Sequence, residues 1–210
     1  MGADSRYDAF SRYGSGVTFV SVRDDDEDGF FVAASVLTAS VSPFTLAVSV
    51  GERRDALTPM TDGATWSLSI LGVQHVELVS RLTGRTSPGE RREAVIAAGA
   101  RRSTEGPLWL PDALASFWCR TVSATPVNDQ VLVVGEVLRV GEIGDGAPLM
   151  RWGRRFGSVS ALPGERAAST CRRFRRSGHE AGPNRHNGRG RTWPAVGSPA
   201  VVWVQSVRTE

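Results

Sequence analysis

The stretch "GFFVAASVLTASVSPFTLAVSV", residues 29–50, decides the fold of this chain. It is rich in small and β-branched residues, carries no charge and is broken only by Pro43. Such residues favour strands, so we predict one extended run over residues 30–42 and a second over 44–50. The neutral segment 32–43 is either a plain buried strand or a floor on which a flat, polar molecule lies.

The segments on either side add further strands and a few short helices. Apolar residues recur every three positions from Val73 to Leu82, which predicts an amphipathic helix that ends at Gly84. Residues 87–90, "SPGE", predict a capping box for a second helix that ends near residue 99. Asp55 is expected to cap a third, short helix. Strands are predicted at residues 16–23, 64–71, 115–124 and 130–143, with an exposed acidic turn at 24–29 and a half-buried face on 64–71, and residues 147–159 close the ordered part.

Six or seven strands in series, with short helices between a few of them, predict a mainly β fold, a β-barrel with short helical insertions. A chain of 210 residues is long enough for a real core. We expect an N-terminal arm at 1–9, a barrel domain at 10–160 and a tail at 161–210. The tail is rich in Arg, Gly and Pro and is expected to be poorly ordered; residues 200–207 either add an edge strand or remain a sticky end.

Charge and cysteine content narrow the class of protein. The tail holds nine arginines against three acidic residues, whereas residues 1–160 hold 16 arginines against 19 acidic residues. The main body is therefore not expected to bind nucleic acid. No apolar run is long enough to span a membrane, no signal peptide is recognisable, and two cysteines are too few for a disulfide framework. These features predict a cytoplasmic protein.

The usual catalytic signatures are absent from the sequence. No phosphate-binding glycine motif and no serine nucleophile elbow occur. His75 is expected on the polar face of its helix, and Cys119 is expected to be a small buried hydrophobe. Cys171, His179 and His186 leave a weak alternative of metal binding, but their spacing is unlike that of a zinc site. A cofactor can still carry the chemistry while the protein binds and orients it.

The order of several segments resembles the flavin reductase-like family, the FMN-binding split barrels. The segments are "GVTFVSVR", "GFFVAASVLTASVSPFTLAVSV", "WSLSILGVQHVELVSRLTG", "NDQVLVVGEVL" and "APLMRWGRRF", over residues 10–156. These barrels are similar to the reductase components of two-component monooxygenases. The resemblance implies a homodimer, bound FMN or possibly FAD, NAD(P)H as the hydride donor, and a partner monooxygenase. It implies no catalytic side chain and no metal.

The resemblance also implies which residues contact the flavin. The family's T-A-S-S-F-T-S-V-S run stands here as "VAASVLTAS", so Ala33, Ala34, Ser35 and Val36 are expected along the isoalloxazine edge. Where the family places phosphate-binding hydroxyls, this chain has "GERRDA", in which Arg53 and Arg54 are able to replace them. The further residues implied are Ser49, Val50, Gly51, Ser69 (in place of an Asn), Gln130 (in place of a His near the nicotinamide), Trp152, Arg154 and Phe156.

Three functions remain open from the sequence. The first is an NAD(P)H-dependent flavin reductase that supplies reduced FMN to an oxygenase. The second is a flavin-binding barrel without reductase activity, because the hydroxyl pair, the Asn and the His are replaced. The third is an interaction protein whose basic tail binds nucleic acid through salt-dependent contacts.

Overall fold

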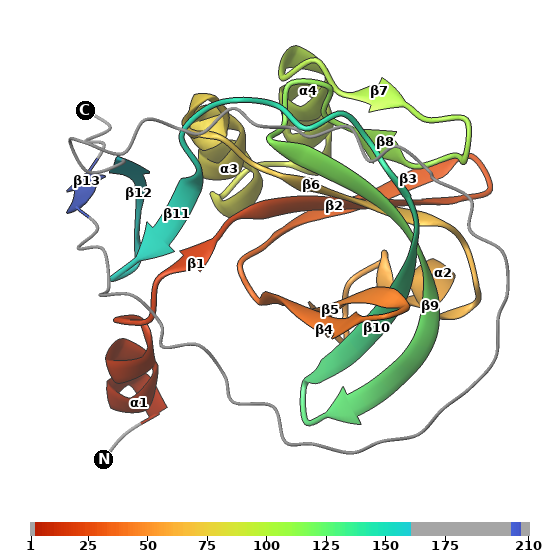
Figure 1. Ribbon diagram of the computed structural model, residues 1–210, viewed down its shortest axis with the longest axis horizontal. Coiled ribbons are helices and arrows are strands. Elements are labelled where there is room, and N and C mark those ends of the chain that lie inside the picture. Colours follow the sequence, from red (N-terminus) through yellow and green to blue (C-terminus); the bar gives the residue numbers. More distant parts are fainter. Residues whose placement is uncertain (1–2, 161–202, 207–210) are drawn as a thin grey trace, which may run out of the picture. The chain divides into compact units, whose positions relative to one another are not determined.

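The computed structural model describes residues 3–160 and 203–206 (Figure 1). Its main element is a seven-stranded sheet in the order β3-β2-β6-β9-β10-β5-β4, and every neighbouring pair is antiparallel. The strands are β2 (Thr18–Asp24), β3 (Glu27–Ala33), β4 (Val36–Val41), β5 (Phe44–Gly51), β6 (Trp66–Ile70), β9 (Ala115–Val127) and β10 (Gln130–Val140). The expected mainly β fold is confirmed.

The remaining elements are short. A second sheet runs in the order β1 (Ser15–Gly16), β11 (Leu149–Trp152), β12 (Arg155–Ser160) and β13 (Trp203–Ser206), and β7 (Arg101–Arg102) pairs with β8 (Leu108–Trp109). The helices are α1 (Ala3–Phe10), α2 (Leu57–Thr61), the 3-10 turn η1 (Val73–His75), α3 (Val76–Thr83) and α4 (Pro88–Ala97). The edge strand considered for 200–207 is present as β13. The predicted disorder of the tail and the metal alternative at Cys171, His179 and His186 lie outside the described residues.

The single extended run predicted for residues 30–42 is wrong, because this segment forms two strands at opposite edges of the sheet. β3 pairs with β2, and β4 pairs with β5. The chain crosses from one edge to the other through Ala34 and Ser35, the two residues between the strands. The sheet curls so that both ends can be reached by this short link (Figure 1).

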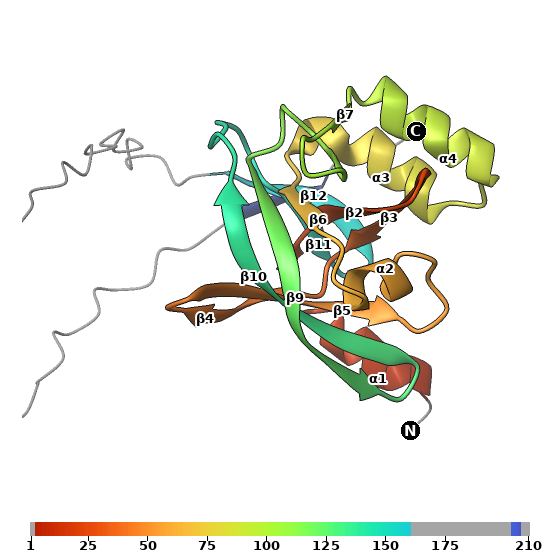
Figure 2. The ribbon, with the colours of Figure 1, turned by 90° about the vertical axis from the view of Figure 1, so that its right-hand side faces the viewer.

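Two apolar clusters hold the fold together. The first lies inside the curled sheet and includes Val48, Trp66 and Val133. The second lies between β2, α3, α4 and β11 and includes Phe19, Val79 and Leu149. Figure 2 shows α3 and α4 together on one side of β2 and β6, which explains why both faces of β2 are buried.

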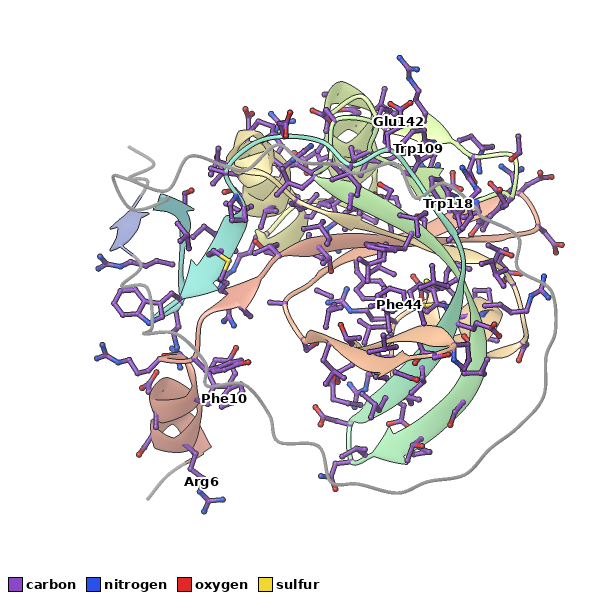
Figure 3. The ribbon with its side chains drawn as sticks, viewed as in Figure 1. Arg6, Phe10, Phe44, Trp109, Trp118 and Glu142 are labelled. Atoms are coloured by element: carbon purple, nitrogen blue, oxygen red, sulfur yellow. The ribbon has the colours of Figure 1, made fainter. Side chains whose placement is uncertain are left out.

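Tryptophans fill much of the interior. Trp118 on β9 packs edge-on against Trp109 on β8, with ring centroids 5.4 Å apart (Figure 3). Trp66 on β6 lies against Gly135 on β10, where an added Cβ atom would overlap Cζ2 of the indole. Only glycine at position 135 leaves room for this ring.

Two local expectations for β6 and α2 are corrected. β6 was expected to be half-buried, but both faces are covered, since Trp66 and Leu68 face the first cluster and Ser67 and Ser69 lie under residues 108–110. The hydroxyl of Ser67 therefore donates to the carbonyl oxygen of Leu108 instead of facing solvent. Asp55 does not cap α2, since the N-cap is Ala56 and makes no side-chain bond.

His75 also differs from expectation, because it is 3% exposed rather than on a solvated face. Its Nδ1 accepts a hydrogen bond from the backbone N–H of Gly72 at 3.2 Å. The proton of the neutral imidazole is therefore on Nε2, which lies 3.0 Å from Oδ1 of Asp112. The side chain ties η1 to the loop before β9, a role that helical periodicity does not reveal.

Candidate functional site

The candidate site is organised by the pairing of β5 with β10. Ser49 is opposite Leu132, and Gly51 is opposite Gln130. Residues opposite each other in paired strands share a face of the sheet. Val48, Val50 and Val133 alternate with them and point into the first cluster. Ser49, Gly51 and Gln130 therefore lie together on the outer face.

Ser35 completes this polar group from the link between β3 and β4. The N–H of Ser49 donates to the carbonyl oxygen of Ser35 at 3.2 Å. The hydroxyl of Ser35 donates to the carbonyl oxygen of Ser49 at 3.4 Å. The Ser49 hydroxyl in turn donates to Oε1 of Gln130 at 3.4 Å. Ser35, Ser49 and Gln130 form what we call the outer-face polar group.

A tight turn sets the position of Gln130. β9 ends at Val127 and β10 begins at Gln130, so only Asn128 and Asp129 connect them. Asn128 has a φ of 54°, a left-handed conformation that asparagine adopts more readily than most residues. The N–H of Glu52 donates to the carbonyl oxygen of Asp129 at 3.0 Å, which fixes the turn against the end of β5.

The loop after β5 carries the two arginines that the sequence singled out. The N–H of Arg54 donates to the carbonyl oxygen of Gly51 at 3.0 Å, which closes a turn at the end of the strand. The Arg54 guanidinium lies 5.1 Å from the centre of the Phe31 ring. Arg53 and Arg54 are exposed and form no ion pair with any described residue. Both are therefore free to bind an anion.

Several expected contact residues have their side chains in the core. Ala33 and Val50 are buried in the first cluster, and Val36 packs against it. The expectation that these residues contact a flavin stays a prediction, and their buried side chains leave the backbone to make that contact. Ala34 is half-buried, and Ser35 alone of residues 33–36 is exposed. Successive residues of β5 face opposite sides of the sheet, and the register of β4 against β5 turns Val36 to the core side. These two features explain which of the expected residues are buried.

Ser69 does not belong to the outer-face polar group. It lies on β6, and β9 and β10 separate that strand from β5. Its hydroxyl is fully buried, lies 2.8 Å from that of Ser116 and accepts a hydrogen bond from the Leu110 N–H at 3.3 Å. The flavin contact expected of Ser69 stays a prediction, and its hydroxyl is already engaged inside the protein.

The β11–β12 hairpin holds the other expected site residues, and helix α1 and the segment after it engage two of them. The Arg154 guanidinium forms an ion pair with Asp8 at 2.8 Å. The indole N–H of Trp152 donates to the carbonyl oxygen of Arg12 at 3.0 Å. Phe156 packs against the second cluster. Within one chain these residues are therefore not brought together with Ser49 and Gln130.

Sequence reasoning missed the apolar residues that surround the outer-face polar group. Leu132 and Val127 share its face and are 37% and 50% exposed, and Leu37 on β4 is 56% exposed. The sequence gives no clear signal for them, because the start of β10 is a valine-rich run in which inward-facing and outward-facing residues look alike. Only the register with β5 shows that Leu132 faces outward whereas Val133 is buried.

The outer-face polar group fits the polar edge of a flavin. Two hydroxyls and one carboxamide supply both donors and acceptors, which an edge of alternating ring nitrogens and carbonyl oxygens requires. The contact of Gln130 with Ser49 and that with Asp129 are both 3.4 Å, at the long limit for hydrogen bonds. A ligand can replace such weak contacts at little cost.

No other arrangement in the described part of the chain suggests a catalytic centre. Within it, no group of three His, Cys, Asp or Glu side chains is placed to hold a metal ion. Cys119 is buried as expected, and burial raises the pKa of its thiol to about 12. No helix among the described residues is long and apolar enough to cross a membrane.

Comparison with known proteins defines the class. The protein-family model of the flavin reductase like domain matches residues 10–160 of this chain. FMN reductase (NADH) RutF of Methylorubrum extorquens strain AM1 is 31% identical over 157 residues, which cover 74% of this chain and 76% of the relative. The chain belongs to the flavin reductase-like family.

Solved structures share the fold. Flavin reductase PheA2 aligns with a TM-score of 0.67 at 20% identity, over 77% of this chain and all of PheA2. BorF, the flavin reductase component of a bacterial two-component tryptophan halogenase, aligns with a TM-score of 0.67 at 22% identity, over 75% of this chain and 98% of BorF. These structures show the shared fold, and the family model and RutF confirm the expected family.

Proposed function

We propose that this chain is an NAD(P)H-dependent flavin reductase, a split barrel that binds FMN, and FAD as well, and passes a hydride directly to the flavin. The outer-face polar group is the observation that carries this proposal. Ser35, Ser49 and Gln130 come from three separate strand ends and converge on one face. Membership of the flavin reductase-like family supports the same function.

The residues of this site bind and orient; none of them is required to react. The flavin, when bound, supplies the N5 atom that accepts a hydride from C4 of the nicotinamide. Ser35, Ser49 and Gln130 fix the polar edge of the ring, and Arg53 and Arg54 bind its phosphate. Gln130 cannot titrate, so it orients its ligand without transferring a proton. Alignment of two reactants supplies the catalysis in such a site.

Oxidation of NADH and NADPH, followed at 340 nm with added FMN, tests the proposal. We expect turnover, and the visible spectrum of the same sample reports whether flavin is bound. A folded chain that neither binds flavin nor oxidises either nucleotide would contradict the proposed function.

The proposed active unit is a homodimer. Leu37, Val127 and Leu132 form an exposed apolar surface around the outer-face polar group. Burying this surface against a second copy also excludes water from the flavin site. Leu132→Asp is expected to give monomers and weaker FMN binding, whereas Ile143→Asp, at a residue that is 80% exposed beyond β10, is expected to leave a dimer. Light scattering coupled to gel filtration distinguishes the two, and a wild-type monomer would contradict the proposal.

A partner oxygenase and a cytoplasmic location complete the proposal. BorF is the reductase component of a two-component system, and a reductase that releases its flavin needs an acceptor. The free thiol of Cys119 is compatible with a reducing compartment. Oxidation of NADH that continues with only a catalytic amount of FMN, in the presence of a flavin-dependent oxygenase, would support release of reduced flavin.

The second candidate is a flavin-binding protein without reductase activity. The observations in its favour are the loop after β5, where residues 53–56 hold no hydroxyl, Ser69 in place of an Asn and Gln130 in place of a His. Tight FMN binding without oxidation of NADH or NADPH would select this candidate. The third function, nucleic-acid binding through the tail, falls on residues outside the described part of the chain.

A further inference from the structure

A cavity of about 590 Å³ lies between helices α3 and α4 and the loop before β9. Figure 2 shows the two helices side by side. No member of the outer-face polar group lines this cavity, and neither does Arg53 or Arg54. Its volume is in the range of small-molecule sites, about 300–1,000 Å³. It is therefore a candidate for a second binding site, separate from that of the flavin.

One wall of the cavity is apolar and built mostly from small side chains. Leu78 on α3 and Ala94 on α4 are both 4% exposed and belong to the second cluster. Ala97 and Ala98 at the end of α4 and Pro111 in the loop continue this wall. Alanine side chains project little from a helix, so the wall leaves room for a bulky apolar group of a ligand, whose burial is favourable.

The carboxylate of Asp112 also lines the cavity and is held in place by its neighbours. Its Oδ1 accepts a hydrogen bond from Nε2 of the buried His75 at 3.0 Å. Its backbone carbonyl oxygen accepts another from the carboxamide of Gln74 at 2.9 Å. A neutral imidazole does not cancel the charge of the carboxylate, and the Asp112 side chain is 58% exposed. This carboxylate is thus positioned to bind a cationic group.

Arg101 brings the opposite charge to the same cavity. It begins β7, its side chain is exposed, and it forms no ion pair with a described residue. The other arginine of the lining, Arg81, already lies 3.7 Å from Oε1 of Glu77. Arg101 pairs with Trp109 in the β7–β8 ladder, and Asp112 follows Trp109 by three residues. The positive and the negative side chain therefore lie on adjoining segments.

We propose that this cavity binds a zwitterionic amino acid with a large apolar side chain. The ammonium group of the ligand binds Asp112, its carboxylate binds Arg101, and its side chain packs on Leu78 and the alanines of α4. A simple amine or a simple carboxylic acid would engage only one of the two charged side chains, and a purely apolar molecule would engage neither. The inference goes beyond the proposed function, because none of the lining residues belongs to the flavin site.

Titration calorimetry with L-phenylalanine on the full-length chain tests the inference. We expect phenylalanine to bind more tightly than 3-phenylpropanoate, which lacks the amino group, and than 2-phenylethylamine, which lacks the carboxylate. All three carry the same aromatic ring, so the differences in affinity report the two charged contacts.

Two variants assign each charge to its residue. Asp112→Asn removes the charge but keeps an oxygen that can accept from His75. It is expected to weaken phenylalanine binding about tenfold, since a lost hydrogen bond to a charged group has about that effect, and to leave 3-phenylpropanoate unaffected. Arg101→Ala is expected to weaken phenylalanine binding to a similar extent and to leave 2-phenylethylamine unaffected. Asp62→Asn and Arg85→Ala are the matched controls, because both residues are exposed and lie outside the cavity.

The inference is overturned if phenylalanine does not bind, if either analogue binds as tightly as phenylalanine, or if the test variants bind it as tightly as the controls. Melting temperatures show whether the variants are folded, and the three ligands on the wild-type chain decide the inference even where a variant does not fold. FMN titration of the same sample reports on the proposed function separately. A chain that binds FMN but not phenylalanine overturns this inference alone, and one that binds phenylalanine but no flavin overturns only the proposed function.

Discussion

Ser49 and Gln130 are 81 residues apart in the chain, yet the hydroxyl of Ser49 donates to Oε1 of Gln130 across the β5–β10 pair. The contact lies on the outer face of the sheet, whereas their neighbours Val50 and Val131 pair on the opposite face. A shift of one residue in this register would place Ser49 and Gln130 on opposite faces of the sheet. The position of the candidate site therefore depends on the register of these two strands.

Removing either partner of this contact is expected to weaken FMN binding. Ser49→Ala and Gln130→Ala should each lower the affinity by about 2- to 10-fold, the range for one neutral hydrogen bond. The double variant should lose less than the two single losses combined, because the two side chains interact. Fluorescence titration with FMN measures each affinity. Ser123→Ala, an exposed serine on β9, serves as control, and equal effects there would contradict the assignment.

Gly135→Ala is expected to lower the free energy of unfolding by about 1–3 kcal/mol. The added Cβ would overlap Cζ2 of Trp66 and also approach Cβ of Cys119 at 3.1 Å. Chemical denaturation followed by tryptophan fluorescence measures the change. Gly89→Ala is the control, because a Cβ at that position in α4 meets no atom within 4 Å. Equal stability of the two variants would show that Trp66 can move aside.

Cys119 is expected to be inert in the folded protein. Burial raises the pKa of its thiol to about 12, so almost no thiolate exists near neutral pH. In a Cys171→Ser chain, Cys119 is the one remaining cysteine. Its reaction with an aromatic disulfide at pH 8 should be negligible until denaturant is added. Rapid modification without denaturant would show that β9 opens under native conditions.

Glu90 is expected to contribute stability that depends on pH. Hydrogen bonds from the Ser87 N–H and hydroxyl, at 2.7 and 2.8 Å, lower the pKa of Glu90. A carboxyl group with a lowered pKa stabilises the folded state above its unfolded pKa, and that stability is lost as the pH falls through the folded value.

Glu90→Gln should therefore melt below the wild type at pH 7, and the difference should shrink below about pH 4. Melting temperatures across this range test the sign. Glu93→Gln is the control, since Glu93 is exposed on the same helix and forms no hydrogen bond or ion pair with a described residue. A difference for Glu90→Gln that grows on acidification would contradict the capping role.

The sequence predicted the strands and helices better than it predicted which face each side chain occupies. The capping box of α4 was recognisable because it depends on residues three positions apart. The burial of His75 was not, because its partner Asp112 comes from a distant loop. The buried partners of Ser69 and the inward direction of Val50 were not predictable for the same reason. The order and register of strands decide their surroundings, and local periodicity carries no information about either.

The positions of the candidate site residues were most predictable where the backbone alone determines them. Ser35 and Gly51 occupy strand ends, and Gln130 follows a two-residue turn, all of which sequence patterns suggest. Trp152 and Arg154 were expected at the same site, but α1 and the segment after it engage them in the chain itself. Such an arrangement arises from residues that are about 140 positions apart.

The antiparallel pairing of β5 with β10 has a consequence for folding during synthesis on the ribosome. After Ser49 has been added to the chain, the ribosome must add 81 more residues before its partner Gln130 exists. At roughly 5–20 residues per second, that takes roughly 4–16 s. During this interval one edge of β5 has no partner strand, and pairing across so long a loop is slow. Flavin capture by a nascent chain would therefore begin only after β10 has emerged.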